Sequence, residues 1–137
     1  MSCTTSATNC ITCDGSSQFR ILSGSSCICS NGYFDPGTGS PICVMCSNAC
    51  ATCNSNFSNC LTCAGTISTR LAAPSCACKA KFYDDGSSAD CQSCHYSCRT
   101  CTNGLACLTC DPSKFRIFNL LNNFCACDIR YYNDGTN

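Results

Sequence analysis

Six cysteines and the single histidine of the chain lie within residues 91–110, "CQSCHYSCRTCTNGLACLTC". Thiols and an imidazole at such close spacing can bind a metal ion, serve as nucleophile and base, exchange with other thiols, or join in disulfides. These four chemistries differ in the spacing and in the surrounding fold that they require.

Zinc is disfavoured by the spacing. A structural zinc site usually takes two C-x2-C pairs that are a dozen or more residues apart, so that each pair reaches the metal from its own turn. Here only three residues separate Cys94 from Cys98. His95 corresponds to Ser47 in the related stretch "CVMCSNACATC", and a ligand should not be replaced in one copy. We therefore expect no metal and no cofactor.

Catalysis is also disfavoured. The chain has seven C-x2-C pairs, but thiol redox chemistry requires a thiolate of lowered pKa beside a βαβ scaffold, which the sequence does not predict. A Cys98 nucleophile with His95 as its base would require an unpaired thiol and a residue that orients the histidine. We expect no enzyme activity and no catalytic residues, and we favour disulfides.

The composition favours disulfides and an oxidising compartment. The 137 residues include 21 cysteines, whereas Leu, Ile, Val and Phe together number 22. Such a chain cannot form a conventional core, and small domains of this kind are held by disulfides in oxidising compartments. We expect an extracellular or cell-surface protein of the secretory pathway. Eight basic and eight acidic side chains, scattered singly, give no electrostatic footprint for nucleic acid.

The sequence shows neither a signal peptide nor a membrane span. The opening "MSCTTSATNC" has no basic region followed by an apolar one, and no run of about 18 apolar residues occurs. Two explanations remain open: a signal was removed, or the sequence is a piece of something longer.

The elements that position the cysteines repeat along the chain. The C-x-C pairs Cys27 and Cys29, Cys76 and Cys78, and Cys125 and Cys127 follow one another at intervals of 49 residues. This period divides the chain into a truncated first repeat (1–42), a complete second repeat (43–90) and a third repeat that lacks its closing cysteine (91–137).

Each C-x-C pair has similar flanks. An arginine followed by an aliphatic residue, in "FRIL", "TRLA" and "FRIF", precedes it, and two aromatic residues with a turn, "YFDPG", "FYDDG" and "YYNDG", follow it. Aromatic and β-branched residues bounded by Asp, Asn, Pro and Gly predict short strands closed by tight turns. The fold class that we expect is a small, disulfide-rich, extended rod of tandem cysteine-rich repeats with short β-hairpins, little or no helix and a minimal hydrophobic core.

The order C-x2-C-x3-C-x2-C, then C-x2-C, then a C-x-C element followed by "YF", "FY" or "YY" resembles the furin-like repeat of growth-factor-receptor ectodomains, in the tandem form found in large protist surface proteins. The resemblance implies nine disulfides: Cys13 to Cys27, Cys29 to Cys43, Cys46 to Cys53, Cys50 to Cys60, Cys63 to Cys76, Cys78 to Cys91, Cys94 to Cys101, Cys98 to Cys107, and Cys110 to Cys125. An exchange of partners between Cys76 and Cys78 stays open.

The resemblance leaves Cys3, Cys10 and Cys127 as unpaired or inter-repeat cysteines. In a fragment Cys3 can pair locally with Cys10. In a longer chain or an assembly, all three would pair with cysteines outside this sequence.

Two classes of function fit such repeats. The first is a structural protein: a disulfide-stapled spacer, a surface coat or a filament-forming element whose partners are copies of itself or neighbouring repeats. The alternative is a ligand- or protein-binding module of a receptor-like ectodomain. The sequence determines neither the full-length protein nor its ligand.

Two further features bear on the choice. Asn56 begins the one sequon of the chain, Asn56-Phe57-Ser58, which is either an N-glycan site of a glycoprotein or an unmodified turn. The stretch "KFRIFNLLNNF" carries six large apolar side chains that form either a contact patch or a cover for their own hairpin. These residues are Phe115, Ile117, Phe118, Leu120, Leu121 and Phe124.

Overall fold

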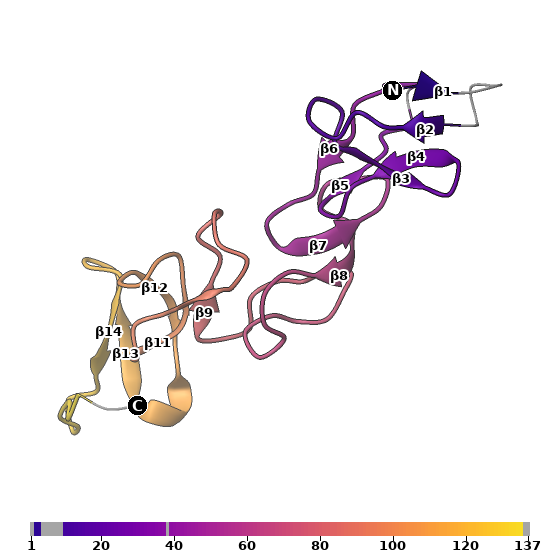
Figure 1. The fold of residues 1–137 in the computed structure, drawn as a ribbon. Coiled ribbons are helices and arrows are strands. Elements are labelled where there is room, and N and C mark those ends of the chain that lie inside the picture. The colour runs from indigo at the N-terminus through magenta and orange to yellow at the C-terminus, as the bar shows by residue number, and fades with distance from the viewer. Residues whose placement is uncertain (1, 4–9, 38, 136–137) are drawn as a thin grey trace. The chain divides into compact units, whose positions relative to one another are not determined.

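The computed structural model describes residues 2–3, 10–37 and 39–135. Its regular structure consists of β-hairpins and one turn of 3-10 helix, η1 (Pro112–Lys114). The expected fold class is confirmed: this is a small disulfide-rich fold of tandem hairpins with little core (Figure 1). The described helix is too short to cross a membrane.

In the described part of the chain the strands form seven two-stranded antiparallel sheets. Each sheet is a hairpin of two consecutive strands joined by a loop. The pairs are β1 (Ser2–Cys3) with β2 (Cys10–Thr12), β3 (Arg20–Ser23) with β4 (Ser26–Cys29), β5 (Tyr33–Phe34) with β6 (Val44–Met45), β7 (Cys50–Cys53) with β8 (Cys60–Cys63), β9 (Phe82–Tyr83) with β10 (Gln92–Ser93), β11 (Cys98–Cys101) with β12 (Cys107–Cys110), and β13 (Arg116–Asn119) with β14 (Phe124–Cys127).

The arginine-aliphatic stretches form strands in two of the three repeats. "FRIL" and "FRIF" give β3 and β13, whereas "TRLA" gives only an isolated bridge between Arg70 and Cys78. The second repeat continues with Leu71-Ala72-Ala73-Pro74, which lacks the β-branched and aromatic residues that favour strands, and Pro74 has no amide hydrogen to give to a ladder.

Disulfides form most of the interior. Among the described residues thirteen apolar side chains are buried; twelve are cysteines and the other is Phe34. One cluster combines Phe34 with Cys46, Cys50, Cys53, Cys60 and Cys76. A second contains Cys98, Cys101, Cys107 and Cys125, with Tyr83 and Phe118 packed against it. Sulfur atoms thus occupy the place that aliphatic side chains take in a larger domain.

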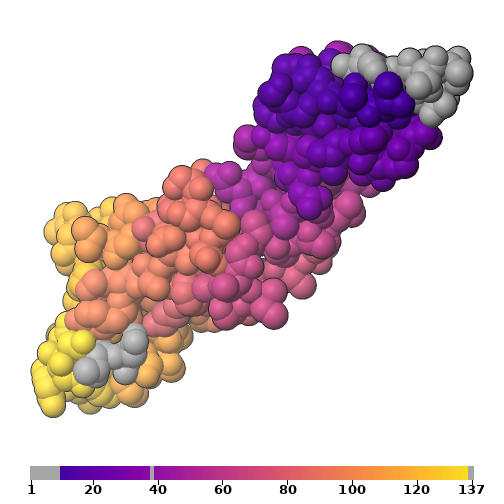
Figure 2. Space-filling view, in the orientation of Figure 1, coloured from indigo at the N-terminus to yellow at the C-terminus, as the bar shows by residue number. Residues whose placement is uncertain are grey.

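Two compact units divide the chain: Met1–Ala64 with Ala72–Cys76, and Gly65–Leu71 with Ala77–Asn137. Within each unit, segments close in sequence lie together, as the blocks of similar colour in Figure 2 show. The boundary between the units falls inside the second repeat of the sequence. It does so because Cys63 and Cys76 bond within the first unit, whereas Arg70 and Cys78 take part in contacts of the second.

Candidate functional site

An arginine lies opposite the second cysteine of the C-x-C element in every repeat. The register pairs Arg20 with Cys29, Arg70 with Cys78 and Arg116 with Cys127. The guanidinium of each arginine reaches the loop that follows the C-x-C element. We call this arrangement the arginine clamp, made of the arginine and the Asp or Asn that it contacts in that loop.

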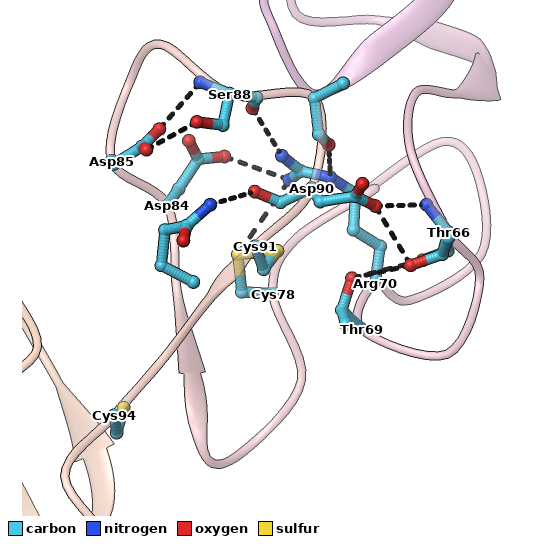
Figure 3. Close-up of a disulfide and its surroundings, with 12 residues drawn as sticks. Thr66, Thr69, Arg70, Cys78, Asp84, Asp85, Ser88, Asp90, Cys91 and Cys94 are labelled. Atoms are coloured by element: carbon cyan, nitrogen blue, oxygen red, sulfur yellow. Dashed lines mark hydrogen bonds and ion pairs between the residues drawn. A yellow bond between two sulfur atoms is a disulfide. The ribbon is translucent and has the colours of Figure 1, made fainter.

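The clamp of Arg70 is the most enclosed (Figure 3). The Arg70 side chain is 0% exposed, and its Nη1 donates to Oδ2 of Asp84 at 2.9 Å. Its Nε donates to the carbonyl oxygen of Ala89 at 2.8 Å and its Nη2 to that of Ser88 at 3.4 Å. The fixed fork of the guanidinium therefore ties the loop of residues 84–90 to the backbone around Cys78.

That loop is also held by its own carboxylates. Asp84 accepts a hydrogen bond from the Gly86 amide at 3.0 Å, and Asp85 accepts from the Ser88 hydroxyl and amide at 2.6 and 2.7 Å. The hydrogen bonds from Ser88, followed by the bond from the Ser87 amide, lower the pKa of Asp85 far below its usual range. The loop is thus arranged to present its carbonyl oxygens to Arg70.

Asp90 fastens the end of the loop to the segment before Arg70. Its Oδ1 accepts hydrogen bonds from the Thr66 amide and, at 2.9 Å, from the Thr66 hydroxyl, which together lower the pKa of Asp90. Gly65, at φ +66°, permits this approach, since a Cβ there would lie 2.5 Å from the Ala89 carbonyl oxygen and from Asp90 Oδ1.

The first repeat builds the same clamp. Arg20 Nη2 lies 2.7 Å from Asp35 Oδ2, and its Nε donates to the carbonyl oxygen of Pro41 at 2.7 Å. Pro41 and Ala89 each stand two residues before the cysteine that closes the loop, Cys43 or Cys91. The hydrogen bond from Arg20, together with one from the Gly37 amide, lowers the pKa of Asp35.

The third repeat has a neutral version. Arg116 Nη2 donates to Oδ1 of Asn133 at 3.3 Å, so the contact is a hydrogen bond without an ion pair. Arg116 also lies over the ring of Tyr96, 5.1 Å from its centroid, and Asn133 Nδ2 donates to the Tyr96 hydroxyl at 2.6 Å. A ring contact therefore accompanies the weaker polar contact in this copy.

Aromatic pairs flank the clamps of the first and third repeats. The rings of Phe19 and Tyr33 stack 4.5 Å apart, and those of Phe115 and Tyr131 stack 4.3 Å apart. The second repeat has Thr69 at the position of the phenylalanine, and its clamp arginine is the most buried of the set. In the first and third repeats stacked rings thus accompany the arginine contact, whereas in the second repeat the enclosed ion pair holds the loop without a phenylalanine at this position.

The described residues contain nine disulfides, and they join the pairs that the resemblance implies. The bonds are Cys13–Cys27, Cys29–Cys43, Cys46–Cys53, Cys50–Cys60, Cys63–Cys76, Cys78–Cys91, Cys94–Cys101, Cys98–Cys107 and Cys110–Cys125. Cys76 and Cys78 bond in opposite directions along the chain and are not exchanged. Within the described part, half-buried Cys127 forms no disulfide. Whether Cys3 pairs locally with Cys10 or with a cysteine outside this sequence stays open, because the described structure does not include the Cys3 side chain.

His95 and Cys98 do not form a nucleophile and base. Cys98 is buried in its bond to Cys107, and His95 Nδ1 contacts the Ser97 hydroxyl at 2.8 Å instead. Ser97 is 1% exposed, so a substrate has no access to its oxygen. The histidine ring also packs against Phe124, with ring centroids 4.8 Å apart. His95 thus fixes the loop before β11 against the hairpin of β13 and β14.

The six apolar residues of the third repeat do not share one surface. Phe118 is half-buried against the second cystine cluster, Phe124 packs on His95, and Phe115 stacks on Tyr131. Ile117 is exposed, and Leu120 and Leu121 at the hairpin tip are 82% and 97% exposed. The hairpin covers part of its own apolar surface and leaves the tip to solvent.

Asn56 lies exposed in the loop between β7 and β8. No group of three or more His, Cys, Asp or Glu side chains among the described residues is placed to hold a metal ion. No family model, curated protein or solved structure matches the chain.

Proposed function

We propose that this chain is an extracellular structural element, a disulfide-stapled array of furin-like repeats that serves as a spacer, a surface coat or a filament-forming unit. The proposal rests on one observation above all: each hairpin is a separate sheet, and each disulfide spans only 7 to 15 positions in sequence. Stability is therefore added locally, unit by unit, as in other repeat proteins.

The oxidising compartment is supported by the cystines. Among the described residues, eleven of the thirteen buried apolar side chains are cysteines of the nine disulfides, so reduction would remove the cross-links that hold most of the interior together. A bridge that closes a loop of about 15 residues contributes roughly 3 kcal/mol in the chain-entropy model. Disulfides in this number persist in secreted and cell-surface proteins and are rare in the cytosol.

The clamps fit a structural role. In the first two repeats the arginine faces a carboxylate, and the buried guanidinium of Arg70 donates to Asp84 and to backbone carbonyl oxygens. The clamp recurs in each repeat, as an ion pair in the first two and as a neutral hydrogen bond in the third, which is expected of a device that fixes the path of the chain.

Secretion of the chain from a eukaryotic cell tests this function. The purified protein is analysed by non-reducing intact mass spectrometry with thiol alkylation, by a zinc assay, and by small-angle scattering with sedimentation velocity. We expect at least nine disulfides, no zinc, and either elongated monomers or end-joined oligomers. A reduced chain with stoichiometric zinc would contradict the proposed compartment and role together.

The alternative, a binding module of a receptor-like ectodomain, has support from the exposed tip of the third hairpin. The third repeat has two adjacent exposed leucines at this tip, whereas the equivalent loop of the second repeat, "GTISTRLAAPS", has the single leucine Leu71. The double substitution Leu120→Ser with Leu121→Ser tests whether this tip joins copies of the chain. If self-association is lost while the disulfides form, the tip joins copies of the chain; if self-association is unchanged, the tip is not a contact between copies.

A further inference from the structure

The loop of residues 54–59, between β7 and β8, holds three asparagines in unequal settings. Asn54 and Asn59 close the loop, with the Asn54 amide donating to the Asn59 carbonyl oxygen at 3.1 Å. Asn56 lies at the exposed outer part of the loop and is followed two positions later by a hydroxyl residue, Ser58. Among the three, Asn56 alone starts an Asn-x-Ser/Thr sequence.

The oxygen and the nitrogen of the Asn56 side-chain amide differ in their hydrogen-bond partners. Its Oδ1 accepts hydrogen bonds from the Ser58 amide at 3.1 Å and from the Ser58 hydroxyl at 3.2 Å. Among the described residues no hydrogen bond to its Nδ2 is found, and the residue as a whole is exposed. The side chain therefore presents its nitrogen while the neighbouring hydroxyl holds its oxygen.

This geometry is local. Both contacts to Oδ1 span two residues, so they require neither the disulfides nor the cystine cluster. They can form on a chain that has just entered an oxidising compartment, and they persist in the folded unit, where Asn56 and Phe57 are exposed.

We propose that Asn56 is an acceptor of N-linked oligosaccharide. Its Nδ2 attacks the anomeric carbon of an oligosaccharide carried on a polyprenyl diphosphate. The new C–N bond forms as the C–O bond to the diphosphate breaks; the amide nitrogen loses one proton, and the polyprenyl diphosphate leaves with the electron pair. The inference rests on the proposed function in one respect, since the transfer takes place in the secretory pathway.

The third repeat supplies a matched control. Asn103, in the equivalent loop between β11 and β12, makes the same kind of turn, with Oδ1 accepting from the Leu105 and Ala106 amides at 2.9 Å each. It lacks only a hydroxyl two positions on, since residue 105 is leucine. The exposed Leu105 can be replaced by threonine without disturbing packing.

The test uses the 137-residue chain, secreted from an N-glycosylating eukaryotic cell. Peptide N-glycosidase in heavy-oxygen water converts a glycosylated asparagine to a labelled aspartate, and peptide mass spectrometry locates the label. We expect the label at Asn56 in the wild type, none in Ser58→Ala, retention in Ser58→Thr, and a second label at Asn103 in Leu105→Thr.

The outcomes separate this inference from the proposed function. A secreted chain with its disulfides formed but with Asn56 unmodified overturns the inference and leaves the structural role standing. A chain with a glycan on Asn56 but with free thiols supports the inference and contradicts the structural role. A label that survives Ser58→Ala also overturns the inference, because the hydroxyl would then play no part.

Discussion

The Nη1 atom of Arg70 lies 2.9 Å from Oδ2 of Asp84, in an ion pair whose cation is wholly enclosed and whose anion remains 40% exposed. A buried guanidinium is costly to desolvate, and here two backbone carbonyl oxygens share the compensation with the carboxylate. The pair fixes a loop in a protein that has few apolar side chains to do so.

Replacement of Arg70 by alanine should therefore loosen the second unit. The carbonyl oxygens of Ala89 and Ser88 lose their donors, and we expect a loss of roughly 2 to 3 kcal/mol of local stability. Hydrogen exchange at the Lys79 amide, which donates to the Thr69 carbonyl oxygen beside Arg70, measures the change. Arg20→Ala is the control and should leave Lys79 protected, because Arg20 belongs to the other unit. Equal effects of both substitutions on Lys79 would argue against a local clamp.

A single substitution, Asn133→Asp, can give the third repeat the ion pair that its clamp lacks. Asn133→Asp places a carboxylate 3.3 Å from Arg116 Nη2, where the first two repeats have an ion pair. We expect a gain of about 0.5 kcal/mol in low salt that shrinks as salt is added. Exchange at the Asp128 amide, which donates to the Phe115 carbonyl oxygen, reports it. Asn119→Asp adds the same charge on the hairpin tip and should give no gain.

Three glycines form a graded series. Gly65→Ala should be the most harmful, because its Cβ would meet the Ala89 carbonyl oxygen and Asp90 at 2.5 Å in a left-handed backbone. Gly86→Ala, at φ +73° with no atom within 4 Å, should cost about 1 kcal/mol. Gly104→Ala, whose nearest contact is the Tyr83 hydroxyl at 3.8 Å, should be close to neutral. Hydrogen exchange around each site ranks the three, and a harmless Gly65→Ala would contradict the described approach of the Asp90 loop.

Acid should release the bond between Asp90 and Thr66. The hydrogen bonds from Thr66 lower the folded-state pKa of Asp90 below 3.8, so the ionised carboxylate stabilises the fold. That contribution is complete above the pKa of the unfolded chain and is lost as the pH falls through the folded-state pKa. The NMR shift of the Thr66 amide should follow the transition with a midpoint below pH 3.8. Asp90→Asn should abolish it, whereas a midpoint above 3.8 would be inconsistent with these bonds.

The pairing around the C-x-C elements is open to direct chemical test. We expect partial reduction and alkylation, followed by peptide mass spectrometry, to find Cys63 with Cys76 and Cys78 with Cys91. Without reduction, an alkylating reagent should label Cys127 and none of the eighteen bonded cysteines. A peptide linking Cys63 to Cys78 would show that the two partners are exchanged and that Arg70 does not lie beside the Cys78–Cys91 bond.

The sequence predicted the hairpins where aromatic and β-branched residues abut Gly, Asp or Asn, since these preferences act over a few residues. "FRIL" and "FRIF" became strands, whereas "TRLA" did not, because Pro74 follows it closely. The disulfide pairs were predicted from the resemblance to a known family, because cysteine spacing alone is compatible with many connectivities.

Only one half of each clamp is evident from the sequence. The arginine recurs at a fixed place in each repeat, but its Asp or Asn partner lies 14 to 17 positions later, in a stretch whose residues predict only a turn. The coincidence of that arginine with an Asx-x-Gly turn in each repeat is the pattern that would have revealed it. The six apolar residues of the third repeat could not be apportioned from sequence, because the register of β13 with β14 decides which of them face the cystines.

In the first two C-x-C elements the first cysteine bonds to a cysteine earlier in the chain and the second to one later in the chain, and this pattern has a mechanical consequence. From Cys13 to Cys125, nearly every residue lies inside a loop that a disulfide closes. Only one or two residues between successive disulfide-closed loops lie outside all of them. These links are Ile28, Val44–Met45, Leu61–Thr62, Ala77, Gln92–Ser93 and Leu108–Thr109. A pulling force applied at Cys13 and Cys125 is therefore carried through sulfur–sulfur bonds. Unfolding can release almost no hidden chain length, so the oxidised protein would act as a tether that resists stretching, and reduction would turn it into an extensible one.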